Sequence, residues 1–117
     1  MQDPAQMDRR VRDVLALIAV RFPEPWSLAM FARHVDLSPA HLARLFGIAT
    51  GTTLMAALKA RRMAHAAELL CATQLTVKQI KFDVGFADDS HFVRDFEGIY
   101  GQSPANYRQA RPINIGQ

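Results

Sequence analysis

The sequence predicts an all-α fold of about seven helices, arranged as two helix-turn-helix subdomains that a long linker helix joins. Two segments about fifty residues apart follow the same design, and an internal repeat of this size indicates one supersecondary unit used twice. Apolar residues recur at helical spacing, and no segment alternates with period two over any length. Serine, threonine, proline and glycine residues mark the helix ends along the chain.

The repeat relates residues 27–53 to residues 76–103. An offset of 49 residues pairs Ser27 with Thr76, Leu28 with Val77, Phe31 with Ile80, Val35 with Val84 and Leu37 with Phe86. An offset of 50 residues pairs Ser38 with Asp88, Leu42 with Phe92, Arg44 with Arg94, Phe46 with Phe96, Gly51 with Gly101 and Thr53 with Ser103. The slip of one residue lies between Phe86 and Asp88, where a turn can absorb an insertion.

The first expected helix precedes the repeat and runs from its N-cap, Asp8, to about Arg21. It ends before Pro23, because proline disfavours helical backbone in the residue that precedes it. Its apolar face follows the i, i+3, i+4, i+7 pattern and comprises Val11, Val14, Leu15, Ile18 and Ala19.

The first copy of the repeat is expected to hold two helices and a turn. Ser27 caps the first of them, residues 28–35. Ser38 and Pro39 restart the helix after the turn, since the hydroxyl accepts a backbone N–H and proline suits the first helical position. This second helix ends at Gly51.

Thr53 is then expected to cap a long helix that reaches about Cys71, a segment of 19 residues. At about 1.5 Å per residue it is roughly 28 Å long. Its candidate core positions are Leu54, Leu58, Met63, Ala66, Leu69 and Leu70.

In the second copy, Thr76 and Gln79 match a capping box that opens a helix to about Val84. The later boundaries are a turn at residues 85–87, an N-cap at Asp88 or Ser90, a helix end at Gly101 and a last short helix from Ser103 and Pro104. The chain thus divides into an N-terminal tail (1–7), a first subdomain (8–52), the linker helix (53–71), a second subdomain (72–110) and a C-terminal tail (111–117).

Composition agrees with this fold and limits the function. Half of the residues are hydrophobic, which is enough for a core. The chain has 14 Lys and Arg against 11 Asp and Glu, and the resulting net charge of +3 suits an anionic partner without proving one. The single cysteine, Cys71, excludes an internal disulfide and fits a reducing compartment. No apolar stretch approaches the ~20 residues of a membrane span, and the N-terminus lacks a signal-peptide core. We therefore expect a cytoplasmic protein that does not contact membranes.

Each copy has the faces that a DNA-reading helix-turn-helix needs. Apolar side chains hold the two helices together, and the solvent face of the second helix enters the major groove. The apolar residues are Phe31, Val35, Leu37, Leu42, Leu45 and Phe46 in the first copy and Ile80, Val84, Phe86, Phe92 and Phe96 in the second. Successive major grooves lie ~34 Å apart on one face of B-DNA. A linker helix of roughly 28 Å could therefore hold two DNA-binding helices of one chain near this spacing.

At this point the motifs resemble the DNA-binding domain of AraC-type bacterial transcription regulators, over roughly residues 8–108. The first copy carries Ser27-Leu28, Ala32, Val35, Leu37-Ser38-Pro39, Leu42, Arg44-Leu45-Phe46 and Thr50-Gly51. The second, more specific stretch carries Ile80, Val84-Gly85-Phe86, Ser90-His91-Phe92, Arg94, Phe96, Tyr100-Gly101, Ser103-Pro104 and Tyr107-Arg108. The resemblance implies binding to promoter DNA and, as a rule, activation by contact with RNA polymerase. It also implies that any effector-sensing or dimerising domain lies outside this chain.

The resemblance, together with the exposed helix faces, assigns the candidate DNA contacts. The base-facing residues are Ala40, His41, Ala43 and Arg44 in the first copy and Asp89, Ser90, His91, Val93 and Arg94 in the second. The candidate phosphate contacts are Arg33, Ser38, Arg61, Arg62, Lys78 and Lys81. Negative charge at Asp89, Asp95 and Glu97 predicts that the second copy contributes less affinity, unless Asp89 itself reads a cytosine amino group.

Other interpretations remain open beside this one. The arginines of the second helices are compatible with ordinary solvated surface, and tandem helical units also serve as protein-interaction modules without DNA binding. The histidines have no metal-ligand spacing among themselves or with Cys71, so we expect no metal or cofactor. The chain offers no nucleophile, metal set or phosphate loop, so we expect no enzymatic activity.

Overall fold

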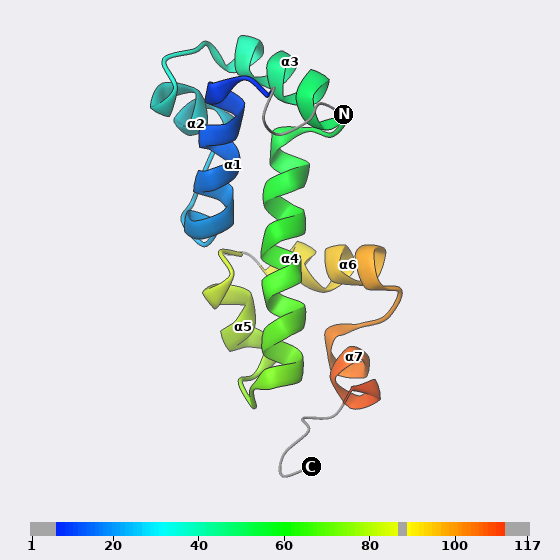
Figure 1. Ribbon diagram of the computed structural model, residues 1–117. Helices are drawn as coiled ribbons and strands as arrows, with labels where there is room; N and C mark the ends of the chain where they lie inside the picture. Colours follow the sequence, from blue (N-terminus) through cyan, green and yellow to red (C-terminus); the bar gives the residue numbers. More distant parts are fainter. Residues whose placement is uncertain (1–6, 87–88, 112–117) are drawn as a thin grey trace. The chain divides into compact units, whose positions relative to one another are not determined.

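Seven α helices make up the described part of the chain, residues 7–86 and 89–111 of the computed structural model, and no strand occurs in these residues (Figure 1). They are α1 (Arg9–Arg21), α2 (Leu28–His34), α3 (Pro39–Thr50), α4 (Leu54–Ala72), α5 (Val77–Asp83), α6 (Asp89–Tyr100) and α7 (Pro104–Ala110). The all-α prediction is confirmed. The chain divides into two compact units, residues 1–61 and 62–117, and the division falls within α4.

The first helix begins where the sequence predicts. Asp8 is its N-cap, and the carboxylate accepts the backbone N–H of Arg10 at 2.8 Å. Three residues of the expected apolar face are buried: Val11, Val14 and Ile18. Ala19, expected on this face, is instead exposed. The reason is that one residue beyond Ile18 is a rotation of about 100° around a helix of 3.6 residues per turn, which carries Ala19 out of the buried stripe.

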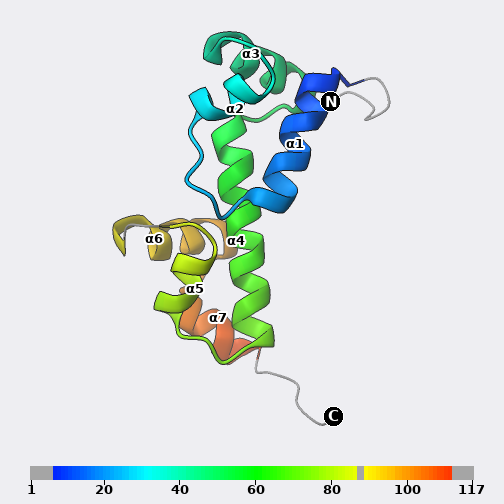
Figure 2. The same cartoon turned by 90° about the vertical axis from the view of Figure 1, so that its left-hand side faces the viewer.

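In the first unit, α2 and α1 both pack against α3 (Figures 1 and 2). The hydroxyl of Ser27 accepts the N–H of Met30 at 3.2 Å, and that of Ser38 accepts the N–H of His41 at 3.1 Å. Pro39 is the first residue of α3, and Gly51 ends the helix with φ 78°. The core of this unit includes the fully buried Phe31, Leu42 and Phe46.

The second unit repeats this arrangement with α5 and α6. Thr76 and Gln79 form the predicted capping box, with bonds of 2.8 and 3.0 Å. The helix α6 ends at Gly101, again with φ 78°. Because α6 begins at Asp89, Ser90 lies inside the helix and is not its N-cap. The alternative cap, Asp88, lies outside the described residues.

The last helix is fixed to the second unit by aromatic and polar contacts. Ser103 caps α7, and its hydroxyl accepts the N–H of Asn106 at 3.1 Å. The ring of Tyr107 contacts that of Phe96 edge-on, with 5.3 Å between centroids. Arg108 donates to the carbonyl oxygens of Leu70 at 3.0 Å and Thr73 at 3.4 Å, at the end of α4. These contacts hold α7 against α6 on one side and against the end of α4 on the other.

The core positions predicted on α4 are mostly buried, namely Leu54, Leu58, Met63, Ala66 and Leu70. Leu69 is the exception, because it is partly exposed while Ala67 is buried. The buried stripe on this half of α4 therefore comprises Met63, Ala66, Ala67 and Leu70. Thr53 caps the helix as expected, accepting the N–H of Ala56 at 3.1 Å.

Candidate nucleic-acid interface

The second helix of the first unit, α3, presents a surface without negative charge. Ala40, Ala43 and Arg44 are exposed, and His41 is partly exposed. On the opposite face, Leu42 and Phe46 are fully buried and fix the orientation of the helix. Arg44 is exposed, and no hydrogen bond or ion pair with another described residue engages its guanidinium.

The second helix of the second unit, α6, presents His91, Val93 and Arg94 to solvent. Nη2 of Arg94 is hydrogen-bonded to Nδ1 of His91. Asp89 and Ser90 occupy the first turn of α6, but their side chains are outside what the structure describes. The exposed surface of α6 therefore repeats the histidine and arginine of α3 at equivalent positions.

Two of the candidate phosphate contacts are exposed cations on the first helix of each unit. Arg33 on α2 and Lys78 on α5 are exposed, and neither makes a hydrogen bond or ion pair with any residue in the described part of the chain. Ser38 is also exposed, although its hydroxyl caps α3. In a helix-turn-helix the first helix lies across the DNA backbone, so Arg33 and Lys78 are on the expected helices.

The charged groups of the three other candidate phosphate contacts, Arg61, Arg62 and Lys81, lie over aromatic rings. Arg61 donates to the carbonyl of Ala19 at 3.3 Å, and its guanidinium lies 4.4 Å from the centre of the Phe22 ring. This is a cation–π contact that ties α4 to the end of α1 within the first unit. Arg61 therefore has a structural role.

The same holds for Arg62 and Lys81 in the second unit. The Arg62 guanidinium lies 5.8 Å from the centre of the Phe86 ring, and its burial lowers the pKa of the group. Lys81 is only 4% exposed, and its ammonium lies 4.4 Å from the centre of the Phe82 ring. Burial removes most of the solvent access that a phosphate contact needs at Lys81, whereas Arg62 is only half-buried.

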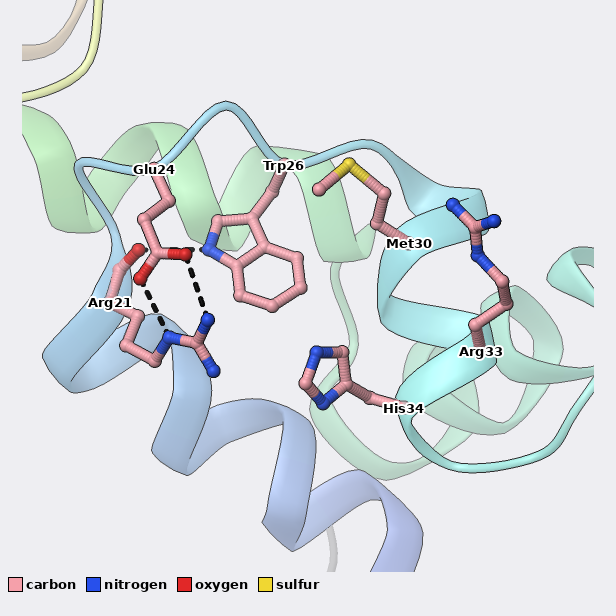
Figure 3. Close-up of a pocket in the computed structure, with 6 residues that line it drawn as sticks. All are labelled: Arg21, Glu24, Trp26, Met30, Arg33 and His34. Atoms are coloured by element: carbon pink, nitrogen blue, oxygen red, sulfur yellow. Dashed lines mark hydrogen bonds and ion pairs between the residues drawn. The ribbon is translucent and has the colours of Figure 1, made fainter.

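A pocket of about 390 Å³ lies between the end of α1 and α2 in the first unit (Figure 3). Three of the lining residues, Arg21, Glu24 and Trp26, are hydrogen-bonded to one another. The Arg21 guanidinium donates to the carboxylate of Glu24 at 2.6 and 2.8 Å, and Nε1 of Trp26 donates to the Arg21 carbonyl at 2.8 Å. The Arg21 bonds also hold the pKa of Glu24 below its usual value. These contacts fix the joint between α1 and α2, and they leave Arg33 as the unpaired cation among the lining residues.

Sequence reasoning missed these aromatic and polar contacts for a physical reason. The partners of Arg61 and Arg62 are far away in the sequence, so no local pattern reveals them. A signal did exist for Lys81, because the repeat aligns it with Ala32, which is 1% exposed. A position that faces the interior in one copy faces it in the other as well.

The described residues contain no group of side chains that could hold a metal ion. Within the same residues, no helix is long and apolar enough to cross a membrane.

Known proteins match this arrangement in sequence and structure. Residues 31–110 match a family model described as a helix-turn-helix domain. The arabinose operon regulatory protein of Salmonella typhimurium is 33% identical over 103 residues, which are 87% of this chain and 37% of that protein. The chain belongs to the AraC-type helix-turn-helix family. It spans about a third of the length of such curated relatives.

Solved AraC-type domains share the fold. The C-terminal domain of AraT, a response regulator from Geobacillus stearothermophilus, is 29% identical, covers 96% of this chain and 93% of its own, and has a TM-score of 0.90. The DNA-binding domain of AdpA, solved in complex with a target DNA, is 25% identical, covers 86% of this chain and 91% of its own, and has a TM-score of 0.82. The two-subdomain helix-turn-helix architecture predicted from the sequence is thus confirmed by the AraC-type fold.

Proposed function

We propose that this AraC-type domain binds a specific sequence of double-stranded DNA, with α3 and α6 in successive major grooves, and thereby regulates transcription. The observation that carries the proposal is the equivalence of the two exposed helix surfaces. His41 and Arg44 on α3 correspond to His91 and Arg94 on α6, and each helix is anchored by buried phenylalanine on its other face. Arginine can bind O6 and N7 of guanine at two points.

The base-facing residues under this proposal are Ala40, His41, Ala43, Arg44, Asp89, Ser90, His91, Val93 and Arg94. The phosphate contacts are Arg33, Lys78 and the exposed Ser38. The names of the relatives support a regulatory role, since they are bacterial operon and transcription regulators, and the AdpA domain was solved with DNA.

In the cell, we propose that the protein activates promoters through contact with RNA polymerase and has no enzymatic activity. It acts in the cytoplasm, where bacterial promoters are transcribed. Any effector-sensing or dimerising domain of the whole protein lies outside this chain, which spans about a third of the length of its curated relatives. The alternative, a helical protein-interaction module, predicts no duplex binding.

The test is selection of bound duplexes from a random pool, followed by affinity measurements with single variants. Arg44→Ala and Arg94→Ala are each expected to weaken binding to the selected site by about 1–3 kcal/mol and to relax preference at one or two base pairs. Arg12→Ala is the matched control, because Arg12 is an exposed arginine on α1, outside the proposed interface. Failure of the pool to enrich any sequence, or equal losses for all three variants, contradicts the proposal.

A further inference from the structure

His91 and Arg94 are joined to each other on the exposed surface of α6. Nη2 of Arg94 is hydrogen-bonded to Nδ1 of His91, three residues earlier. Side chains at this spacing are neighbours on the surface of a helix. Both side chains are exposed, so the bond is made at the surface that the proposed function places in the major groove.

The chemistry of the two groups fixes their roles in this bond. A guanidinium carries five N–H donors and has no acceptor. Nδ1 of His91 must therefore accept, which leaves the imidazole neutral with its proton on Nε2. The bond occupies one hydrogen of Arg94 Nη2. The second Nη2 hydrogen, together with its neighbour on Nε or Nη1, still forms one edge with two donors for a ligand. The bond also restricts the rotamers that the long arginine side chain samples.

We propose that His91 is a positioning residue that orients the guanidinium of Arg94 for two-point contact with a guanine. The inference rests on the proposed function and deepens it by naming the base and the residue that sets the specificity of the second unit. Guanine suits the pair because its major-groove edge presents two acceptors, O6 and N7. A side chain that is already oriented loses less conformational freedom on binding.

The first unit supplies an internal comparison. His41 and Arg44 stand at the same spacing on α3 and are equivalent to His91 and Arg94 at an offset of 50 residues. Both are described, and no hydrogen bond joins them in the structure. The histidine of α3 is thus not bonded to its arginine, so the two units differ at this point although the spacing is the same.

The experiment is a double-variant cycle read as base preference at each position of the selected DNA site. Arg94→Ala is expected to reduce discrimination at one base pair by roughly 5- to 150-fold. His91→Ala is expected to reduce discrimination at that same base pair by about 2- to 10-fold, because the long Arg94 side chain must then be ordered on binding. In the Arg94→Ala background, His91→Ala has no further effect there. His91→Gln, which retains an acceptor, restores part of the loss.

Each other outcome overturns the inference in a recognisable way. If His91→Ala relaxes a different base pair, or adds fully to Arg94→Ala, then His91 reads DNA by itself. If the control Arg12→Ala, outside the interface, reduces discrimination at the base pair read by Arg94 as much as His91→Ala does, the bond on α6 has no special role. In both cases the proposed function stands. If the protein selects no DNA at all, the proposed function fails and the inference falls with it. Because both side chains are exposed, circular dichroism should show all variants folded.

Discussion

Asp36 and Gly85 occupy equivalent positions in the turns of the two units, and both have a positive φ angle, 56° for Asp36 and 102° for Gly85. In both turns the N–H of the next residue donates to the carbonyl of the residue five positions earlier, at 3.0 Å. The turns therefore share one hydrogen-bond pattern. Each turn joins the two helices of its helix-turn-helix, α2 to α3 in the first unit and α5 to α6 in the second. Only the first is built with a residue that carries a Cβ atom.

The turn residues should respond differently to substitution. Gly85→Ala is expected to destabilise the protein by about 1–2 kcal/mol, because a side chain at positive φ clashes with the backbone. Asp36→Gly relieves such a clash but adds freedom to the unfolded chain, so its effect is expected to be within about 0.5 kcal/mol of zero. Denaturation in urea, followed by circular dichroism, measures both. Similar losses for the two variants are incompatible with this account of the turns.

Arg33 and Arg61, two cations of the first unit, are expected to differ in role, the first contacting DNA and the second stabilising the fold. Arg33→Ala is expected to lower the slope of log affinity against log salt by about 0.9, the effect of one lost phosphate contact. Arg61→Ala removes the same charge but also the contact with Phe22, so it should lower stability and leave the salt slope unchanged. Titrations of the selected duplex at several salt concentrations test this. An equal fall in slope for both variants returns Arg61 to the DNA interface.

Asp8 should make the stability of α1 depend on pH. Bonds from Arg10 lower the pKa of Asp8 from 3.8 to about 2. A carboxylate with a lowered pKa stabilises the folded state above its unfolded pKa, and this contribution is lost as the pH falls from about 4 to 2. Asp8→Ala is expected to cost about 0.5–2 kcal/mol at neutral pH.

The control for this prediction is Asp8→Asn, which retains an N-cap oxygen but does not titrate. Its stability should lie close to that of the wild type at neutral pH and lack the Asp8 component of the acid transition. Denaturation curves at several pH values provide the comparison. An acid transition identical in wild type and Asp8→Asn shows that Asp8 is not linked to folding.

The charges of α6 should make the second unit the weaker DNA contact. Between Ser38 and Thr50 the chain has no acidic residue, whereas α6 carries Asp89, Asp95 and Glu97. If these carboxylates repel the DNA phosphates, Asp89→Asn tightens binding to all duplexes, and most strongly at low salt. If Asp89 instead accepts from a cytosine amino group, the same change weakens binding only to sites with that base.

The helix boundaries were predictable because they depend on local signals. Serine, threonine and aspartate caps and terminal glycines act within a few residues, so the ends of α1, α3 and α5 follow directly from the sequence. The internal repeat also predicted which residues of the second unit are equivalent to those of the first. Ala19 and Leu69 were misplaced because an apolar pattern does not define where the edge of a buried stripe falls.

Which charged side chains contact other residues and which lie in solvent could be predicted only in part. Arg33 and Arg61 look alike in the sequence, and only the fold places Phe22 beneath Arg61 and leaves Arg33 in solvent. Spacing alone was also insufficient for the bond on α6. The histidine and arginine of α3 have the same spacing as those of α6, yet only His91 and Arg94 are bonded.

The most direct test of the central claim, that both units read one DNA site, is a hydroxyl-radical footprint on the selected duplex. Wild-type protein is expected to protect two segments centred about one helical turn apart, ~10 base pairs, on one face of the DNA. Arg44→Ala should weaken protection of one segment and Arg94→Ala that of the other. Protection of a single segment in the wild type, or loss of the same segment in both variants, contradicts the claim.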